Sequence, residues 1–271
     1  MTLSLAISPC PNDTFTFHAL VHGLVPGAPP VDVTYADVDV TNSAVGRGEL
    51  DLLKISVAAL PGLDDRYTLL PCGGALGRGC GPLLLTAARR SDPELTGATI
   101  AIPGERTTAY LLFRLWAGDR APARVEVLPF DQIMPAVAGG RVDAGLVIHE
   151  ARFTYPRYGL RAMVDLGEWW EADTGLPIPL GAIVARHAAV DPERAAEWIR
   201  ASVRAAWADP AASRDYVLTH AQEMEPDVVD RHIALYVNGY THDLGADGRA
   251  AVDALLRRAA ALPASPLGAG F

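Results

Sequence analysis

Four short segments with polar side chains lie at or just after the ends of predicted buried strands, at positions where these side chains could do chemistry. In an open, mostly parallel sheet, ligands bind beyond the carboxyl ends of the strands. These segments are residues 8–14, with Asn12 and Asp13; Lys54, Ile55 and Ser56; Thr107 and Thr108; and His149 with Glu150. We therefore expect substrate-binding and catalytic groups among them.

His149 is the candidate for acid–base chemistry. It is the only one of the seven histidines that directly follows a predicted buried strand. A neutral imidazole, with an ordinary pKa of about 6.5, can accept a proton at cellular pH. The alternative is a structural histidine paired with Glu150. His18 and His22 have the i, i+4 spacing of metal ligands, but no third ligand has suitable spacing, so we place both on a helix surface.

Ser56 and the pair Thr107–Thr108 each stand where a helix should begin. Free backbone N–H groups at a helix start attract anions, aided by the helix dipole and by nearby hydroxyls. An ordinary N-cap role is the alternative for each position. The two sites belong to opposite predicted domains and should both face the cleft between them, which favours anion binding over a purely capping role.

Lys54 is the single lysine beside 22 arginines. It could hold a carboxylate, form a Schiff base with a carbonyl substrate, or survive by chance in an arginine-rich composition.

Cys10 precedes a predicted helix, where a thiol pKa can fall, but a buried packing role in the Pro-Cys-Pro turn is the stronger interpretation. The three cysteines include no CxxC pair, so they predict neither a disulfide framework nor a zinc site.

The composition narrows the class of protein. The chain has 271 residues, half of them apolar, and a net charge of −9. That charge disfavours nucleic acid, and no basic stripe with aromatic residues is present. The first residues lack the charged start and long apolar run of a signal peptide, and no run is long enough for a membrane span. We expect a cytoplasmic protein.

Short apolar runs alternate with helical patterns, which predicts an α/β fold. The expected strands cover residues 3–7, 31–35, 51–55, 67–70, 82–87, 98–102, 125–130, 142–148 and 176–186. Helices are expected at about 14–21, 41–47, 57–59, 108–117 and 131–140. Four more should begin near Asp191, Pro210, Pro226 and Ala246. The glycine-rich residues 73–81 lack the ending of a P-loop and read as a flexible connection.

The strand-rich pattern occurs twice. We expect one domain formed by residues 1–88 and 178–271, and a second domain formed by residues 89–177. The chain would then cross between the domains twice and leave a cleft between them.

Five motifs, in this order, resemble the 1,4-dihydroxy-6-naphthoate synthase family of the futalosine route to menaquinone. They are SPCPNDTF at 8–15, KIS at 54–56, GGALGRGCGP at 73–82, TTAY at 107–110 and HEARFTYPRYGL at 149–160. The resemblance runs over nearly the whole chain and includes EWWEADTGLPIPLG at 168–181.

The resemblance implies a periplasmic-binding-protein-like fold of type II. It implies conversion of cyclic dehypoxanthine futalosine to 1,4-dihydroxy-6-naphthoate without a metal or an organic cofactor. His149 matches the family's general base, and its substrate contacts match Lys54, Ile55, Ser56, Thr107 and Thr108; we add Asn12 and Asp13. The expected partner is a small anionic substrate, and the protein would be a monomer or a homodimer.

Two other functions remain open at this stage. A solute-binding protein of a transporter would share the fold, but the missing export signal argues against it. Chorismate dehydratase would share the fold and the pathway, but is not expected to carry the SPCPNDTF opening.

Overall fold

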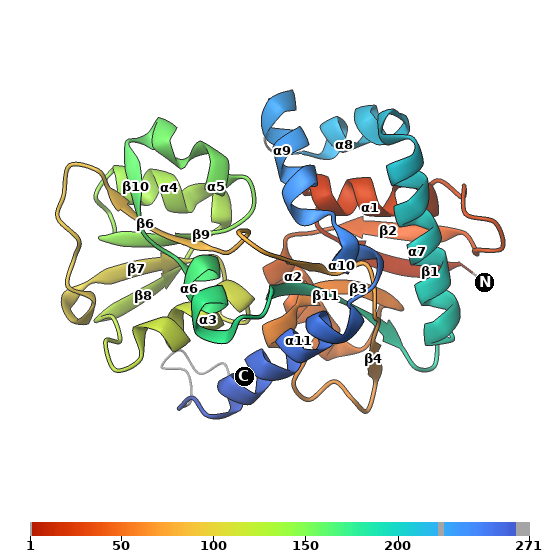
Figure 1. Cartoon of the computed structure of the whole chain (residues 1–271), viewed down its shortest axis with the longest axis horizontal. Helices are drawn as coiled ribbons and strands as arrows, with labels where there is room; N and C mark the ends of the chain where they lie inside the picture. The colour runs from red at the N-terminus through yellow and green to blue at the C-terminus, as the bar shows by residue number, and fades with distance from the viewer. Residues whose placement is uncertain (1, 222–224, 264–271) are drawn as a thin grey trace.

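The computed structural model describes residues 2–221 and 225–263, which form two lobes side by side, each built on its own β-sheet (Figure 1). The chain passes between the sheets twice. The first passage joins β5 (Ala75–Gly77) to β6 (Leu83–Ala87), and the second joins α6 (Leu166–Thr174) to β11 (Ile178–Arg186). The predicted α/β architecture with a double crossover is confirmed. None of the described helices is long and apolar enough to span a membrane.

The first sheet has the strand order β2 (Val31–Tyr35), β1 (Leu3–Ile7), β3 (Leu52–Ser56), β11 and β4 (Tyr67–Leu69), and β5 also pairs with β11. β1 runs parallel to β2 on one side and to β3 on the other. β11 pairs antiparallel with β3, β4 and β5. The apolar runs of β1 and β3 are almost wholly buried. Because β1 and β3 are parallel neighbours, residues 8–14 and Ser56 leave the sheet at the same edge.

The second sheet repeats this arrangement with a different order. β9 (Ala144–Val147) lies between β7 (Thr99–Ile102), which is parallel to it, and β6, which is antiparallel. β8 (Arg124–Val127) and β10 (Leu160–Asp165) form the two edges. The carboxyl ends of β7 and β9 therefore lie together, which places the residues before Thr107 near His149.

The expected boundary at residue 88 is wrong, because β6 belongs to the second sheet. Its partners are β9 and β10, so the chain has already left the first sheet after Gly77. The glycine-rich segment is also not simply a flexible connection, since β5 within it is a paired strand. A Cβ on Gly81 would lie 2.1 Å from the backbone nitrogen of Gly167. Gly81 is needed for the close approach of two backbones.

The helices of the C-terminal third cover the first lobe, and all four predicted starts are confirmed. They are α7 (Pro192–Ala208), α8 (Arg214–His220) after a 3₁₀ turn at Pro210–Ser213, α9 (Pro226–Tyr236) and α11 (Gly245–Ala260). Asp191 caps α7 by accepting a hydrogen bond from the Glu193 N–H. The short helix α10 (Gly239–His242) was not predicted; the Asn238 side chain holds it in a capping box.

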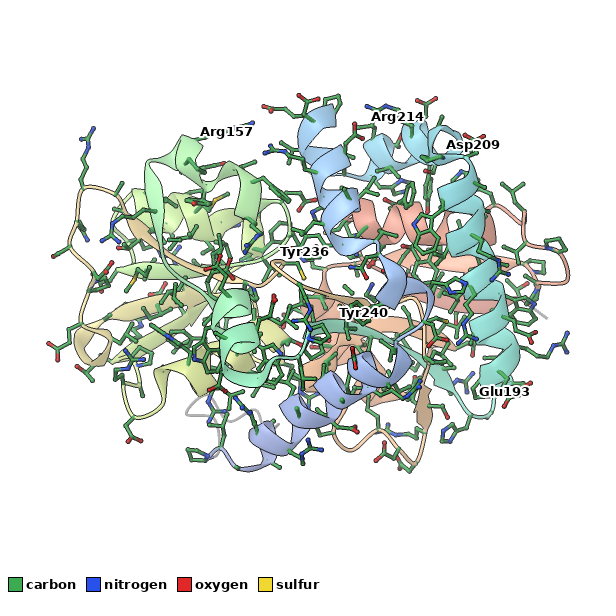
Figure 2. The ribbon with its side chains drawn as sticks, viewed as in Figure 1. Arg157, Glu193, Asp209, Arg214, Tyr236 and Tyr240 are labelled. Carbon is green, nitrogen blue, oxygen red and sulfur yellow. The ribbon has the colours of Figure 1, made fainter. Side chains whose placement is uncertain are left out.

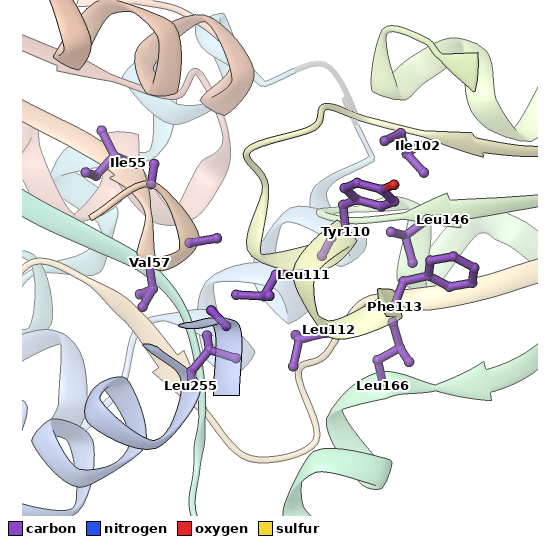
Figure 3. Packing of buried hydrophobic residues seen from close by; sticks show 14 of the residues in the cluster. Ile55, Val57, Ile102, Tyr110, Leu111, Leu112, Phe113, Leu146, Leu166 and Leu255 are labelled. Carbon is purple, nitrogen blue, oxygen red and sulfur yellow. The ribbon is translucent and has the colours of Figure 1, made fainter. Parts of the chain in front are cut away.

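One hydrophobic core runs through both lobes (Figure 3). Leu111 and Leu112 of α3 (Thr108–Ala117), in the second lobe, belong to the same buried cluster as Val57 and Leu255 of the first lobe. All four side chains are almost completely buried. Any movement of one lobe against the other must therefore disturb packed apolar surface on this side of the molecule.

Candidate active site

A cavity between the two sheets contains every residue that the sequence predicted for the site. It encloses about 710 Å³ of space free of protein atoms, including its open mouth. The predicted residues in its wall are Asn12, Asp13, Lys54, Ile55, Ser56, Thr107, Thr108 and His149. The first five come from the first lobe and the last three from the second, so the cavity depends on both.

Asn12 and Asp13 reach the cavity from the first turn of a helix. α1 spans Pro11–Val21, so it begins three residues before the predicted start at Thr14. Proline is well suited to the first helical position, because its missing N–H would have no partner there. The earlier start turns Asn12 and Asp13 into helix residues, and Asp13 is 2% exposed.

Lys54 forms a buried ion pair with Asp13. Its Nζ lies 2.6 Å from Asp13 Oδ1 and 3.1 Å from the carbonyl oxygen of Gly73. Asp13 also accepts hydrogen bonds from the backbone N–H of Ser8 and from Asn12 Nδ2. A Cβ on Gly181 would lie 2.9 Å from Lys54 Cε, so glycine leaves room for the lysine stem. Two protein acceptors thus hold the ammonium in place at the cavity wall.

Ser56 does not cap a helix with its side chain. The turn after it, Val57–Ala59, is a single 3₁₀ turn, and the Ser56 hydroxyl makes no capping bond. Instead, Asn42 Nδ2 donates to Ser56 Oγ at 2.9 Å, and Ser56 N donates to Asn42 Oδ1 at 2.7 Å. The Ser56 N–H is therefore already paired with Asn42, and the anion site at this turn stays a prediction.

The hydroxyls of Thr107 and Thr108 make different hydrogen bonds, although the sequence analysis gives both residues the same role. Thr107 is the N-cap of α3 and accepts from the Tyr110 N–H, as predicted. The Thr108 hydroxyl accepts from Ala58 N at 3.2 Å and donates to the Leu180 carbonyl at 2.7 Å, both in the first lobe. Thr108 therefore ties the two lobes together at the cavity.

His149 has an unusual backbone and a lowered pKa. Its φ is 56°, the only positive value at a described residue other than glycine, and such conformations concentrate at functional sites. Burial lowers the pKa of His149 to about 4, opposed by the Asp13 carboxylate and reinforced by the Lys54 ammonium. Among residues 2–221 and 225–263, neither ring nitrogen of His149 makes a hydrogen bond to the protein. The imidazole is neutral at cellular pH.

Cys10 lies beside His149, but its thiol is unsuited to attack. Cys10 is 2% exposed, and burial raises its thiol pKa well above the usual value, with the Glu150 carboxylate adding to the effect. Only a thiolate is a good nucleophile. Ligand atoms of Cys10, His149 and Glu150 lie within 4.8 Å of one another. These are donor types that zinc accepts, which the sequence did not indicate.

The cavity wall also contains residues that the sequence analysis did not place there. His232 and Tyr236 on α9 line the cavity, and Asn42 anchors Ser56. Figure 2 shows Tyr236 at the end of α9, between the lobes. The ring centroids of His232 and His149 are 6.5 Å apart. The one signal in the sequence is the i, i+4 spacing of His232 and Tyr236, which puts both on one helix face.

This arrangement suits proton removal from an anionic or hydroxylated small molecule. A neutral imidazole can take a proton, the N-terminus of α3 can stabilise negative charge, and a held ammonium adds positive potential. Those groups face one cavity from two lobes, which limits access of water.

The family model described as menaquinone biosynthesis matches residues 3–261. The chain is 63% identical over 265 residues to 1,4-dihydroxy-6-naphthoate synthase of Streptomyces coelicolor, covering 96% of this chain and 93% of that protein. It is 48% identical over 266 residues to the enzyme of the same name from Thermus thermophilus, covering 96% and 94%.

The solved structures give the fold. A Candida albicans protein described as having the generic periplasmic binding protein fold superposes with a TM-score of 0.70 at 11% identity, covering 98% of this chain and 92% of that one. The predicted periplasmic-binding-protein-like fold is confirmed. With a family match over almost the whole length and two curated relatives of one name, the chain belongs to the menaquinone biosynthesis family and is an enzyme.

Proposed function

We propose that this protein is a carbon–carbon lyase that converts cyclic dehypoxanthine futalosine to 1,4-dihydroxy-6-naphthoate, with His149 as general base. The observation that carries the proposal is the single cavity in which neutral His149 and seven other predicted residues meet. The name of the two curated relatives supports the same reaction.

His149 suits the role of base through its position and its charge state. It lies two residues after the end of β9, and its ring nitrogens make no hydrogen bond within the described part of the protein. A positioned base contributes roughly 10²–10⁴-fold to a rate. Breaking a carbon–carbon bond and forming an aromatic ring requires removal of a proton and stabilisation of the negative charge that develops on oxygen.

The carboxylate of the substrate would bind at the start of α3. The N–H groups of Thr108 and Ala109 are first-turn donors for which a helix supplies no acceptor, and both residues line the cavity. Since the Thr108 hydroxyl is used between the lobes, we assign its contact to the backbone. Lys54, held by Asp13, adds positive potential without forming a covalent bond. This assignment needs no metal or organic cofactor.

The decisive experiment mixes the purified protein with cyclic dehypoxanthine futalosine and follows the naphthoate by liquid chromatography and mass spectrometry. We expect wild-type protein to form it and His149→Asn protein to form at least 100-fold less. A parallel incubation with chorismate tests the dehydratase alternative. Binding of the futalosine without turnover by the wild type would favour a binding protein.

Cell fractionation tests the expected cytoplasmic location, and light scattering tests the expected monomer or homodimer.

A further inference from the structure

His232 is a buried histidine in the cavity wall for which the proposed reaction has as yet no use. It lies on α9, is 1% exposed and lines the same cavity as His149. Its ring packs beside Tyr236, with centroids 4.6 Å apart. Its Nε2 lies 2.9 Å from Asn12 Oδ1. The other ring nitrogen, Nδ1, is buried and has no hydrogen-bond partner.

The ion pair between Lys54 and Asp13 determines, through Asn12, which ring nitrogen of His232 carries the proton. The Asp13 carboxylate only accepts, and it receives Lys54 Nζ and Asn12 Nδ2 at the same oxygen. The amide nitrogen of Asn12 must therefore face Asp13, because the reversed amide would set oxygen against oxygen. The amide oxygen then faces His232, so Nε2 of His232 must be the donor. In a neutral imidazole one nitrogen donates and the other accepts, which leaves Nδ1 as a bare acceptor.

An unprotonated, buried ring nitrogen such as His232 Nδ1 destabilises the fold unless a donor gives it a hydrogen bond. Most buried polar atoms in native proteins have a partner, and leaving one unpaired costs its full desolvation. The described protein atoms supply no donor to Nδ1. Because His232 forms part of the cavity wall beside His149, a molecule in the cavity can supply one. The complementary group is a hydroxyl or an N–H.

We propose that His232 is a further substrate-binding residue, whose Nδ1 accepts a hydrogen bond from a hydroxyl of the bound substrate. This inference rests on the proposed function, because the sugar-derived part of the substrate carries the hydroxyl. Asn12 and Asp13 then act as positioning residues that hold His232 in the accepting tautomer. The chain Lys54–Asp13–Asn12–His232 thus connects the only lysine to substrate recognition.

Two substitutions separate the two nitrogens of His232. The amide nitrogen of His232→Gln can replace Nε2 as donor to Asn12, but nothing replaces Nδ1. The amide oxygen of His232→Asn can replace Nδ1 as acceptor, but the bond to Asn12 is lost. With cyclic dehypoxanthine futalosine as substrate, we expect KM to rise roughly 3- to 10-fold in His232→Gln. The rise in His232→Asn should be smaller, and kcat should change less than KM in both.

The tautomer is tested without turnover. Long-range proton–nitrogen spectra of ¹⁵N-histidine-labelled protein distinguish a bare from a protonated ring nitrogen, and the His232→Asn spectrum assigns the signal among seven histidines. We expect a bare Nδ1, whose resonance shifts when the futalosine is added to the His149→Asn variant. Asn12→Ala should weaken this tautomer preference.

A protonated Nδ1 in the free wild type overturns the inference. An Nδ1 resonance unmoved by substrate, or an unchanged KM in folded His232→Gln, also overturns it and shows that Nδ1 holds only water. If His232→Gln does not fold, the wild-type and His149→Asn spectra still decide. A wild type that turns over the futalosine keeps the proposed function whatever His232 does, whereas a wild type without turnover removes both.

Discussion

Lys54 Nζ lies 2.6 Å from Asp13 Oδ1, and both side chains are at most 8% exposed. The pair joins β3 to the first turn of α1 at the cavity wall. It explains why a compact ammonium stands here in a chain otherwise furnished with arginine, since Gly181 leaves space for a straight stem. It also argues against a Schiff base at Lys54, because its nitrogen is already held by Asp13 Oδ1 and by the carbonyl oxygen of Gly73.

Breaking this pair from one side should destabilise the fold. Asp13→Asn leaves a buried ammonium without its carboxylate, and such changes cost about 3–5 kcal/mol in the free energy of unfolding. The double variant Lys54→Met with Asp13→Asn should recover part of that loss, because no charge remains buried. Urea unfolding measures both. The exposed pair Arg47–Glu49 is the matched control, and Glu49→Gln should change little. Equal losses that simply add in the double variant would contradict the coupling.

Thr108 should matter for stability more than for chemistry. Thr108→Val keeps the shape of the side chain but removes both hydrogen bonds to the first lobe. We expect a loss of about 1–3 kcal/mol in the free energy of unfolding, since Ala58 N and the Leu180 carbonyl lose their partner. Thr108→Ser keeps the hydroxyl and serves as control. A Val variant as stable as the wild type would show that the hydroxyl does not connect the lobes.

Ligand should close the lobes only slightly. The usual expectation for two domains joined by two crossings is hinge closure. Here the core at Leu111 and Leu255 already joins them, and Arg157 makes a two-point ion pair with Glu225 at the start of α9. Figure 2 shows Arg157 on the second lobe. Small-angle scattering should give nearly equal radii with and without the naphthoate. A clearly smaller radius with ligand would indicate an open resting state.

Cys10 should be dispensable for turnover and inert to alkylation. Its raised thiol pKa and burial keep it as a thiol at neutral pH. We expect Cys10→Ala to retain substantial activity, and native protein to resist iodoacetamide at this residue, as shown by peptide mass spectrometry. Denatured protein is the positive control for labelling. Complete loss of turnover in folded Cys10→Ala would restore the nucleophile hypothesis.

Removal of metal should leave the rate unchanged. Cys10, His149 and Glu150 bring three possible ligand atoms together, so the expectation of a metal-free reaction needs a direct test. Dialysis against EDTA, followed by assay with and without added zinc, provides it. Loss of activity on dialysis and its return with zinc would make this cluster a metal site and would remove His149 as a free base.

The sequence predicts this site well where a residue belongs to a strand end. The positions of Lys54 and His149 are predicted by the rule that ligands bind at the carboxyl ends of the strands of an α/β sheet, and this rule does not depend on which sheet a strand joins. The sequence does not predict a side chain's hydrogen bonds where these depend on residues far away in the chain. The residues around Ser56 do not indicate that it bonds to Asn42 rather than to its own turn. His232 follows residue 149 by more than 80 positions, and only the docking of α9 on α1 brings it beside His149. The expected domain boundary at residue 88 misplaces β6 for the same reason, because an apolar run does not indicate which strands it will pair with.

The pH dependence of stability should reveal the buried imidazole of His149. Its pKa is about 4 in the folded protein, against about 6.5 in an unfolded chain. Between these values the unfolded chain binds more protons, so the free energy of unfolding falls as pH drops from about 6.5 to 4. Urea unfolding over this range should be less steep in pH for His149→Asn than for the wild type. Equal slopes would show that the imidazole titrates alike in both states.

Replacement of His149 should abolish turnover while leaving the fold and ligand binding intact. Asparagine is the appropriate substitution, because it tolerates the positive φ of 56° better than alanine. We expect kcat to fall by two to four orders of magnitude, with the naphthoate still bound, since the N-terminus of α3 does not depend on the imidazole. The kcat/KM of the wild type should stay level from about pH 8 to 5 and decline near the pKa of about 4, because protonation removes the base. Circular dichroism and the unfolding midpoint of His149→Asn at pH 8 provide the folding control. A folded His149→Asn protein with near wild-type turnover would transfer the search for the base to Asp13, Lys54 and Glu150.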